Sequence, residues 1–331
     1  MDRKIGLFIV SDQDYYHQLL ASEASQAALE HGVELEVFSA DDTPAKQASD
    51  VLRFVAANQD HETYVLVIPL ADAPDGVSVE EDAFYRLASR VLAKGANWVT
   101  LNHGSEDMIA ALRRSFPDRT VSLVMIDNLE FGRAQARQLK AIIPEGGRVL
   151  YVLGNPNDTA SRERHQGLLE ELAGRDYTIE EIDGWWRPDV AERNVMRWIT
   201  SPMRTGVDVA AVLSQDDEMA LAARRAMARA ATAFGRPELA SLPTLGGDGL
   251  PERGERWVAS GELDGTVRVT LPGAPAVALL AEQWRTGVPM SPVTVTEPEA
   301  YPPPERLRGA QPRPRIRATV PPTKHPIVAT A

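Results

Sequence analysis

Cysteine is absent from the 331 residues of this chain. Its absence excludes disulfide bonds, thiolate nucleophiles and cysteine-based metal sites, although it leaves the cellular compartment open. Long apolar runs are missing as well, and no run approaches the roughly 20 residues that a membrane-spanning helix needs. We therefore expect no segment inserted in a membrane.

Positive charge is also in short supply, because 35 lysines and arginines face 47 aspartates and glutamates, for a net charge of −12. A protein that grips nucleic-acid phosphates needs a basic face, so we expect no nucleic-acid partner. The exception is residues 301–331, with eight prolines, six basic residues and Glu305 as their one acid. This composition predicts a proline-rich basic tail that is disordered because it cannot bury a core.

The first ten residues run directly into a strand pattern. The apolar stretch and small-residue cleavage site of a secretory leader do not follow them. As the sequence stands we expect a cytoplasmic location, or the periplasm or cell envelope if a leader has been removed.

Short apolar segments alternate with segments of helical periodicity along most of the chain. Ile5–Val10 precedes a predicted helix at 17–31, for example, and Arg148–Leu153 precedes one at 160–173. Such alternation predicts parallel, doubly wound sheets with helices on both faces. Because 331 residues exceed one ordinary core, we predict an α/β protein of two doubly wound lobes.

A cluster of carboxylates follows one of the predicted strands. Ala210–Leu213 is typical of a buried strand, and Gln215-Asp216-Asp217-Glu218 comes after it, where a helix should begin. In open α/β sheets ligands bind beyond the carboxyl ends of the strands. Asp216 is therefore a candidate ligand-binding residue.

Five more predicted strand ends carry forked donors, carboxylate acceptors or aromatic rings. Such groups are suited to holding a small polar ligand in a cleft. The candidates there are Asp14, Tyr16 and His17 after the first strand, Asn102 and His103 after the fourth, Arg164 in the segment 154–167, Trp186 in the segment 184–189, and Asp248 in the segment 245–249.

Each candidate also has a structural interpretation. The turn at 11–17 is compatible with a solvated helix cap, and His103 with a structural histidine. Arg164 could form a surface salt bridge of little energetic value, and Trp185 and Trp186 could pack in a core. For Asp127, in the pair Asp127-Asn128, we favour a helix cap over ligand contact.

The order and spacing of these segments resemble the type I periplasmic binding proteins, in particular the ribose/galactose-type sugar-binding branch. The resemblance covers about 5–296. It depends most on Arg164-x-x-Gly167, on Gly246-x-Asp248-Gly249, and on the later run 261–267 with its Gly-x-Leu-x-x-Thr-Val pattern. The chain departs from the family at Asn102-His103, where an Asp-Arg pair is common, and at Asp216, which replaces an asparagine.

The resemblance implies two lobes that are discontinuous in sequence and joined by a three-strand hinge. Lobe one would comprise 1–125 plus 271–290, and lobe two 126–270 plus 291–300, with crossings near 104–125, at 270–273 and near 291. Tyr16 and Trp186 would enclose the ring of a sugar. Hydroxyl groups would be held by Arg164, Asp248, Asp216, Asp14 and Asn102.

The resemblance further implies a solute-binding protein that closes around a monosaccharide or polyol. Its partners would be an ABC permease for uptake, or a signalling protein for ligand sensing. Several carboxylates set against Arg164 favour a neutral or cationic ligand over an acidic one. No metal or cofactor is implied, and we expect Arg164→Ala to abolish binding with little change in the stability of the free protein.

Three alternatives remain open. An enzyme is disfavoured because the chain lacks Gly-x-Ser-x-Gly, His-Glu-x-x-His and any Gly-Lys phosphate loop, and its six histidines show no metal-ligand spacing. A repressor of the lactose type should begin with a helix-turn-helix, which the first residues do not predict. A cytoplasmic sensor that uses the same binding fold stays the main alternative.

Overall fold

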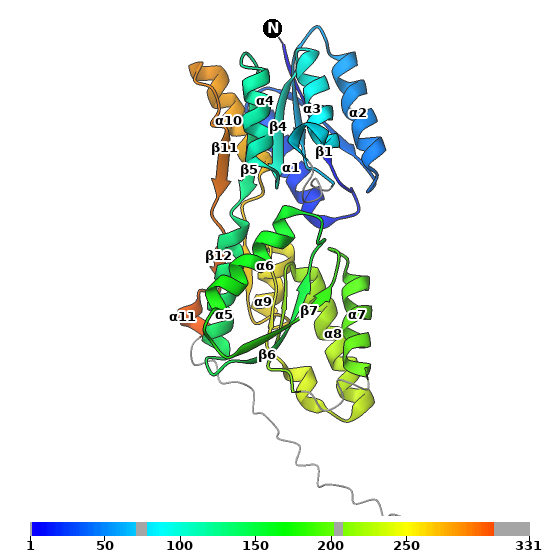
Figure 1. Ribbon diagram of the computed structural model, residues 1–331, viewed down its shortest axis with the longest axis vertical. Helices are drawn as coiled ribbons and strands as arrows, with labels where there is room; N and C mark the ends of the chain where they lie inside the picture. Colours follow the sequence, from blue (N-terminus) through cyan, green and yellow to red (C-terminus); the bar gives the residue numbers. More distant parts are fainter. Residues whose placement is uncertain (1, 71–77, 202–207, 308–331) are drawn as a thin grey trace, which may run out of the picture.

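The computed structural model describes residues 2–70, 78–201 and 208–307. Two lobes, each a parallel β-sheet with helices on both faces, lie one above the other and are joined by a narrow set of connections (Figure 1). This arrangement confirms the predicted α/β class with two doubly wound lobes. Within the described residues no helix is both long enough and apolar enough to cross a membrane.

The first lobe contains a six-stranded parallel sheet in the order β11-β5-β4-β3-β1-β2. Its strands are β1 (Arg3–Ile9), β2 (Glu34–Ser39), β3 (Glu62–Val67), β4 (Asn97–Asn102), β5 (Val121–Ile126) and β11 (Val293–Thr296). Its helices are α1 (Tyr15–Glu30), α2 (Pro44–Ala57), α3 (Ala83–Ala93), α4 (Glu106–Ser115) and α10 (Gly273–Thr286), with a 3₁₀ turn at Val79–Glu81.

Each face of this sheet has a core of its own. In β1, Leu7 and Ile9 pack with α1 and α10, whereas Phe8 packs with α2 and its neighbours on the opposite face. Successive side chains of a strand point to opposite faces. A strand covered on both sides therefore reads as a continuous apolar run, which is why β1 was recognisable in the sequence.

The second lobe contains a four-stranded parallel sheet in the order β7-β6-β8-β9. Its strands are β6 (Gly147–Leu153), β7 (Tyr177–Asp183), β8 (Ala211–Ser214) and β9 (Thr244–Leu245). Its helices are α5 (Asn128–Ile142), α6 (Thr159–Leu172), α7 (Pro188–Thr200), α8 (Asp217–Phe234) and α9 (Arg256–Ser260), with shorter turns at Pro237–Ser241 and Pro251–Glu255. A small antiparallel pair, β10 (Thr266–Arg268) with β12 (Glu299–Tyr301), lies beside them.

Helices α5 and α6 approach each other closely because both carry a glycine at the contact. A Cβ on Gly167 would lie 2.0 Å from the carbonyl oxygen of Leu129, and a Cβ on Gly132 would lie 2.0 Å from that of Arg164. No side chain fits at either position without moving the backbone. The close packing fixes the helix from which Arg164 projects.

Three connections cross between the lobes and are hydrogen-bonded to one another. They lie at residue 127, between β10 and α10, and between β11 and β12. The amide of Asp127 donates to the Thr296 carbonyl at 3.0 Å, and the Thr296 hydroxyl lies 3.4 Å from the Thr270 carbonyl. This differs from the predicted crossings, because 104–125 lies within the first lobe as α4 and β5, and the third crossing comes after Thr296 rather than near 291.

The boundaries at the end of the chain also differ from the prediction. Residues 293–296 form β11, which pairs with β5 and so belongs to the first sheet rather than to lobe two. Residues 301–307 are not a disordered tail, because Tyr301 ends β12 and α11 (Pro304–Leu307) buries Leu307 beside α5. The rest of the predicted tail, 308–331, lies outside the described residues.

Candidate functional site

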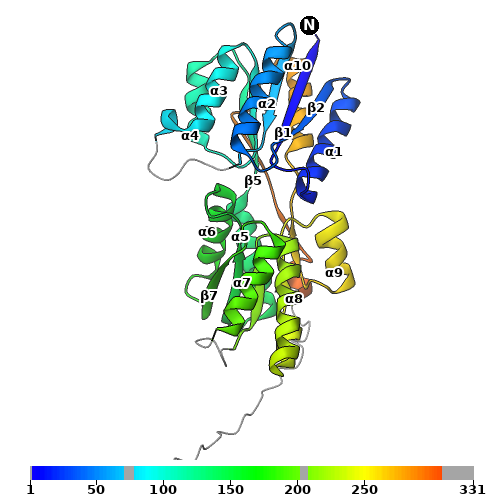
Figure 2. The ribbon, with the colours of Figure 1, turned by 90° about the vertical axis from the view of Figure 1, so that its right-hand side faces the viewer.

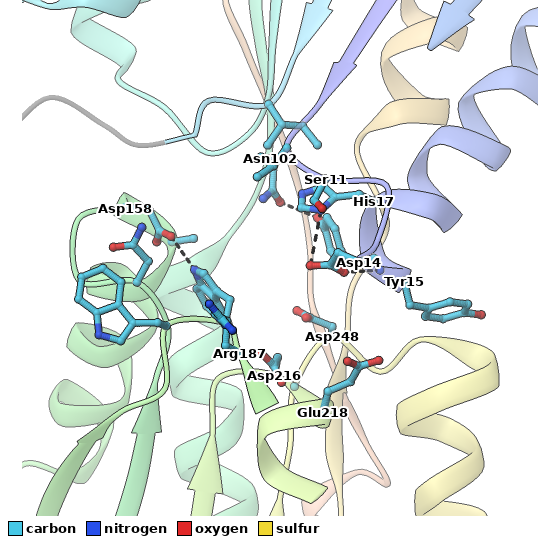
Figure 3. A pocket seen from close by; sticks show the side chains of 18 of the residues that line it. Ser11, Asp14, Tyr15, His17, Asn102, Asp158, Arg187, Asp216, Glu218 and Asp248 are labelled. Carbon is cyan, nitrogen blue, oxygen red and sulfur yellow. Dashed lines mark hydrogen bonds and ion pairs between the residues drawn. The ribbon is translucent and has the colours of Figure 1, made fainter. Parts of the chain in front are cut away.

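A cleft of about 610 Å³ lies where the carboxyl ends of the two sheets face each other. Side chains from both lobes surround it (Figure 3). The structure brings all nine predicted residues to this one cleft: Asp14, Tyr16, His17, Asn102, His103, Arg164, Trp186, Asp216 and Asp248.

The wall from the first lobe begins at the N-terminus of α1. Asp14 caps this helix by accepting from the amide of Tyr16 at 2.8 Å, and its other oxygen lies 3.5 Å from Nδ1 of His17. Burial tends to raise the pKa of Asp14, but the hydrogen bond and charge of His17, together with the backbone amides of Tyr16 and His17, leave this pKa below its usual value. The turn is thus both the predicted helix cap and part of the cleft.

Tyr16 and Asn102 form one unit across this wall. The phenol of Tyr16 donates to Oδ1 of Asn102 at 2.5 Å. Burial, followed by the charge of Asp248, raises the pKa of Tyr16 well above its usual value, so the phenol stays a neutral donor. Asn102 has a φ of +74°, a left-handed conformation that asparagine tolerates better than most residues, and His103 behind it is buried.

Arg164 stands at the centre of the second-lobe wall and is 4% exposed. Its Nε donates to Oδ1 of Asn128 at 3.0 Å, and its Nη1 donates to the Gln215 carbonyl at 2.6 Å and to Oδ1 of Asp248 at 3.0 Å. The guanidinium also lies 3.8 Å from the ring centroid of Phe131. The surface salt bridge considered for Arg164 is therefore wrong, because the side chain is buried and held on several sides.

Trp186 closes another side of the cleft. Its indole packs directly over Gly154, since a Cβ there would lie 2.1 Å from Cζ2 of the ring. Its Nε1 donates to Oδ2 of Asp158 at 2.7 Å, while Oδ1 of Asp158 caps α6 by accepting from the amide of Ser161. Trp185 and Trp186 both have positive φ, and Trp185 is 44% exposed beside the cleft.

Three carboxylates lie at the floor of the cleft, Asp216 and Asp217 after the end of β8 and Asp248 after the end of β9. Asp216 caps α8 by accepting from the amide of Met219 at 2.6 Å. Burial is the largest cause that raises the pKa of Asp216, Asp217 and Asp248, and the charge of Asp248 further raises the other two. For Asp248, Arg164 offsets part of this effect, but the pKa of Asp248 stays above its usual value.

The carboxylate of Asp217 holds a loop in place instead of being free to contact a ligand. Its Oδ2 accepts from the amide of Gly249 at 2.8 Å, and a Cβ on Gly246 or Gly254 would lie within 2.2 Å of its carboxyl oxygens. The carboxylate thus holds the loop that presents Asp248. Asp248 itself has a φ of +78°, so the glycines around it accommodate a sharp turn.

The sequence analysis missed several residues that line the cleft. They include Asp158, Arg187 and Glu218 around its lower wall, and Tyr15 and Arg253 at its side (Figure 3 labels all but Arg253). The signal for Asp158 was present, because an aspartate two residues before Ala160 marks a helix start. No local pattern marks Arg253, which comes from the irregular turn before α9.

Arg253 lines the cleft and contacts residues of both lobes. Its guanidinium lies 4.8 Å from the ring centroid of Tyr15 in the first lobe, and its Nε lies 3.5 Å from Glu218 in the second. Figure 2 shows the beginning of α1 directly above the region of α9, where this contact forms. Tyr15 and Arg253 thus connect the lobes at a point outside the hinge.

The arrangement is suited to holding a polar guest. Neutral donors, carboxylate acceptors and aromatic faces converge on it from both lobes. In the described part of the chain no three His, Asp or Glu residues are grouped so that they could hold a metal ion.

The comparisons with known proteins agree with this geometry. A family model described as "Periplasmic binding protein domain" matches residues 5–279. The ribose import binding protein of Salmonella typhimurium is 25% identical over 263 residues, which are 80% of this chain and 78% of the relative. The ribose import binding protein of Escherichia coli is 27% identical over 166 residues, half of this chain and 52% of the length of that relative.

A solved structure shares the fold over nearly the whole chain. The periplasmic binding protein component of an arabinose ABC transporter from Shewanella sp. ANA-3, bound to α- and β-L-arabinofuranose, superposes with a TM-score of 0.74. It is 17% identical and covers 92% of this chain and 93% of its own, so this likeness shows the fold alone. With the family model matching most of its length, this chain belongs to the periplasmic binding protein family, as its resemblance to the ribose-type branch predicted.

Proposed function

We propose that this chain is a solute-binding protein whose lobes close around a monosaccharide or polyol and which delivers that ligand to an ABC-type importer. The observation that carries the proposal is the convergence of polar groups from both lobes on one cleft of about 610 Å³. The relatives described as ribose import binding proteins support the ligand class and the link to import.

Each proposed ligand-binding residue has a role set by the chemistry of its side chain. Arg164 and Asn102 offer donors to hydroxyl oxygens, and Asp14, Asp216 and Asp248 accept from hydroxyl hydrogens. Tyr16 and Trp186 come from opposite lobes and offer aromatic faces to the apolar side of a ring. His17 and His103 complete the wall of the first lobe.

Closure follows from contacts that only the closed state completes. A ligand shifts the equilibrium between open and closed lobes by its difference in affinity for the two states. The three crossing segments near Asp127, Thr270 and Thr296 are the hinge in this proposal. A ligand that is hydrogen-bonded to Asn102 in the first lobe and to Arg164 in the second would favour the closed state for this reason.

Thermal denaturation with a panel of pentoses, hexoses, inositols and linear polyols tests the proposal. A ligand at 100 times its Kd stabilises the folded state by about 2.7 kcal/mol, which should raise Tm by several degrees. The same samples analysed by NMR should return the ligand unchanged, because we propose binding without turnover. A well-folded protein that no member of the panel stabilises would rule the proposal out.

The output of binding has a second candidate, ligand sensing through a signalling protein. Import and sensing would use the same closure of the lobes. They differ in the partner protein and in the cellular location of this chain. Import requires the protein in the cell envelope, whereas a cytoplasmic sensor does not. Cell fractionation, followed by uptake of radiolabelled ligand in a strain that lacks this protein, distinguishes them, and unchanged uptake would exclude the import role.

A further inference from the structure

The positive charges that line the cleft are already matched by carboxylates of the protein. Among the residues that the structure describes, seven Asp or Glu and three arginines line it. Arg164 is paired with Asp248, Arg187 with Asp189, and Arg253 with Glu218. The cleft therefore offers little free positive charge and an excess of negative charge to a guest.

This pairing leaves Asp216 and Asp217 at the floor without an arginine partner. Asp217 is occupied by the amide of Gly249, so Asp216 is the one that faces the cleft. It accepts from the amide of Met219, and within residues 2–70, 78–201 and 208–307 no lysine, arginine or histidine forms an ion pair with it. The nearby carboxylates of Asp248, Asp14 and Glu218 raise the pKa of Asp216 further, after burial. Figure 3 shows Asp216, Asp248 and Glu218 grouped at the bottom of the cleft and Asp14 above them.

The residues opposite Asp216 do not supply the missing cation. Asn102 presents an amide that is bonded to Tyr16, and His103 is buried behind it. His17 lies beside Asp14, with its Nδ1 3.5 Å from that carboxylate. A positive charge that compensates Asp216 would therefore have to come from the ligand.

We propose that the ligand is an amine-bearing sugar or polyol, and that its ammonium group binds Asp216; this proposal rests on the proposed function. An ammonium group has three donors and no acceptor, so it complements a site rich in carboxylate oxygens. Closure of the lobes removes water and strengthens this attraction. The hydroxyl groups of the same ligand remain available to Arg164 and Asn102.

The aromatic side chains around the cleft favour the same ligand class. Tyr16 and Trp186 line it together with the carboxylates, and aromatic faces attract cations as well as the apolar faces of rings. A neutral sugar could donate a hydroxyl to Asp216 but would leave it without a cation, either charged or protonated, and both carry a cost in a partly buried site. An ammonium group avoids this cost.

Isothermal titration calorimetry with matched pairs tests the assignment. The probes are D-glucosamine with D-glucose and N-acetyl-D-glucosamine, D-galactosamine with its two neutral counterparts, and an aminocyclitol with the parent cyclitol. We expect at least one amine to bind about tenfold or more tightly than both its neutral counterparts at pH 7. Its binding should also be linked to a change in protonation, seen as a dependence of the heat on the ionisation enthalpy of the buffer.

Asp216→Asn gives the decisive variant, because asparagine is as good a helix cap as aspartate. In this variant the ratio of amine to neutral affinity should fall to near one. Asp42→Asn is the matched control, since it removes one carboxylate from the exposed rim of the cleft and should preserve the preference. Circular dichroism spectra should show that both variants are folded.

The outcomes separate this inference from the function on which it rests. A neutral sugar that binds as tightly as its amine, or a preference that survives Asp216→Asn, overturns the amine assignment and leaves sugar binding in place. Failure of every probe, charged and neutral, contradicts the proposed function and the amine assignment together.

Discussion

Asp158 and Trp186 are joined by a hydrogen bond of 2.7 Å from the indole Nε1 to Oδ2, and the other oxygen of the same carboxylate caps α6. One buried side chain therefore fixes both the start of the helix that carries Arg164 and the aromatic wall beside it. The indole is also confined by Gly154, over which it packs. The wall of the second lobe is thus preorganised rather than formed by the ligand.

Asp158→Asn separates these two roles. Asparagine keeps one oxygen for the cap, so the free energy of unfolding should change by less than about 1 kcal/mol. It has no second carboxylate oxygen for the indole, so ligand affinity should fall by about fivefold to tenfold, in line with the 1–1.5 kcal/mol expected for one hydrogen bond. Urea denaturation and calorimetry measure the two quantities.

A double-mutant cycle with Trp186→Phe provides the control for Asp158→Asn. Phenylalanine keeps a ring but has no N–H group, so the doubly substituted protein should bind no more weakly than Trp186→Phe alone. Effects on affinity that simply add would mean that Asp158 does not act through the indole.

Arg164→Ala should destabilise the free protein, contrary to the expectation from sequence that its stability would hardly change. The side chain is 4% exposed, and its loss leaves the Asp248 carboxylate without its cation. Breaking a buried pair in this way typically costs about 3–5 kcal/mol. Urea denaturation of the free protein measures the change.

The paired substitution Arg164→Met with Asp248→Asn should lose less stability than Arg164→Met alone. It removes both charges, and asparagine suits the positive φ of +78° at position 248. Equal losses in the single and double variants would contradict a dominant role for the uncompensated carboxylate. Both variants should still lose ligand affinity, because both lack the guanidinium.

Asp216→Asn should stabilise the ligand-free protein at neutral pH and flatten its dependence on pH. The pKa of Asp216 is raised in the folded state, so the folded protein binds the proton more tightly than the unfolded chain does. The contribution of this group to stability therefore falls as pH rises from about 4 through the folded-state pKa. Removing the titrating carboxylate removes this loss, so the free energy of unfolding near pH 7 should rise measurably.

Thermal denaturation between pH 4 and pH 8, without ligand, measures this effect of Asp216→Asn. The raised pKa values of Asp217 and Asp248 act in the same direction and remain in the variant, so the slope should decrease without vanishing. Asp12→Asn is a suitable reference, because Asp12 is exposed and lies outside the lining of the cleft. A slope unchanged from the wild type would show that Asp216 does not titrate as described.

Arg253→Gln should weaken ligand binding by about twofold to fivefold. Its guanidinium lies 4.8 Å from the ring of Tyr15, and a cation–π contact of this exposed kind contributes about 0.5–1 kcal/mol. Since the two residues belong to different lobes, their contact favours the closed arrangement. Calorimetry measures the affinity, and small-angle scattering should show a slightly larger radius of gyration without ligand.

Tyr15→Leu should have the same effect as Arg253→Gln, and combining the two substitutions should add little. Arg256→Gln is the control for loss of an arginine nearby, because Arg256 is exposed and is not part of the cleft lining. An equal loss of affinity in Arg256→Gln would point to long-range charge rather than to contact between the lobes.

Much of the architecture was predictable because its signals are local. The buried strand β8 is a continuous apolar run, and helix caps such as Asp14 and Asp127 occur where chain direction changes, as the structure confirms. The boundaries of short helices and strands were harder to predict from the sequence. Helix α4 was not predicted, and β11 is only partly buried, so its sequence carries no strong period that assigns it to the first sheet.

The sequence by itself determined the fold class, the family and the set of side chains beyond the strand ends, because hydrophobic period, glycine spacing and capping residues act over a few neighbouring positions. Only the tertiary structure decided how those side chains pair. Arg164 and Asp248 are 84 positions apart, and Tyr16 and Asn102 are 86 apart. Their contacts, and the fact that no cation of the described residues pairs with Asp216, depend on how two sheets and three crossing segments are placed in space, which no local pattern encodes.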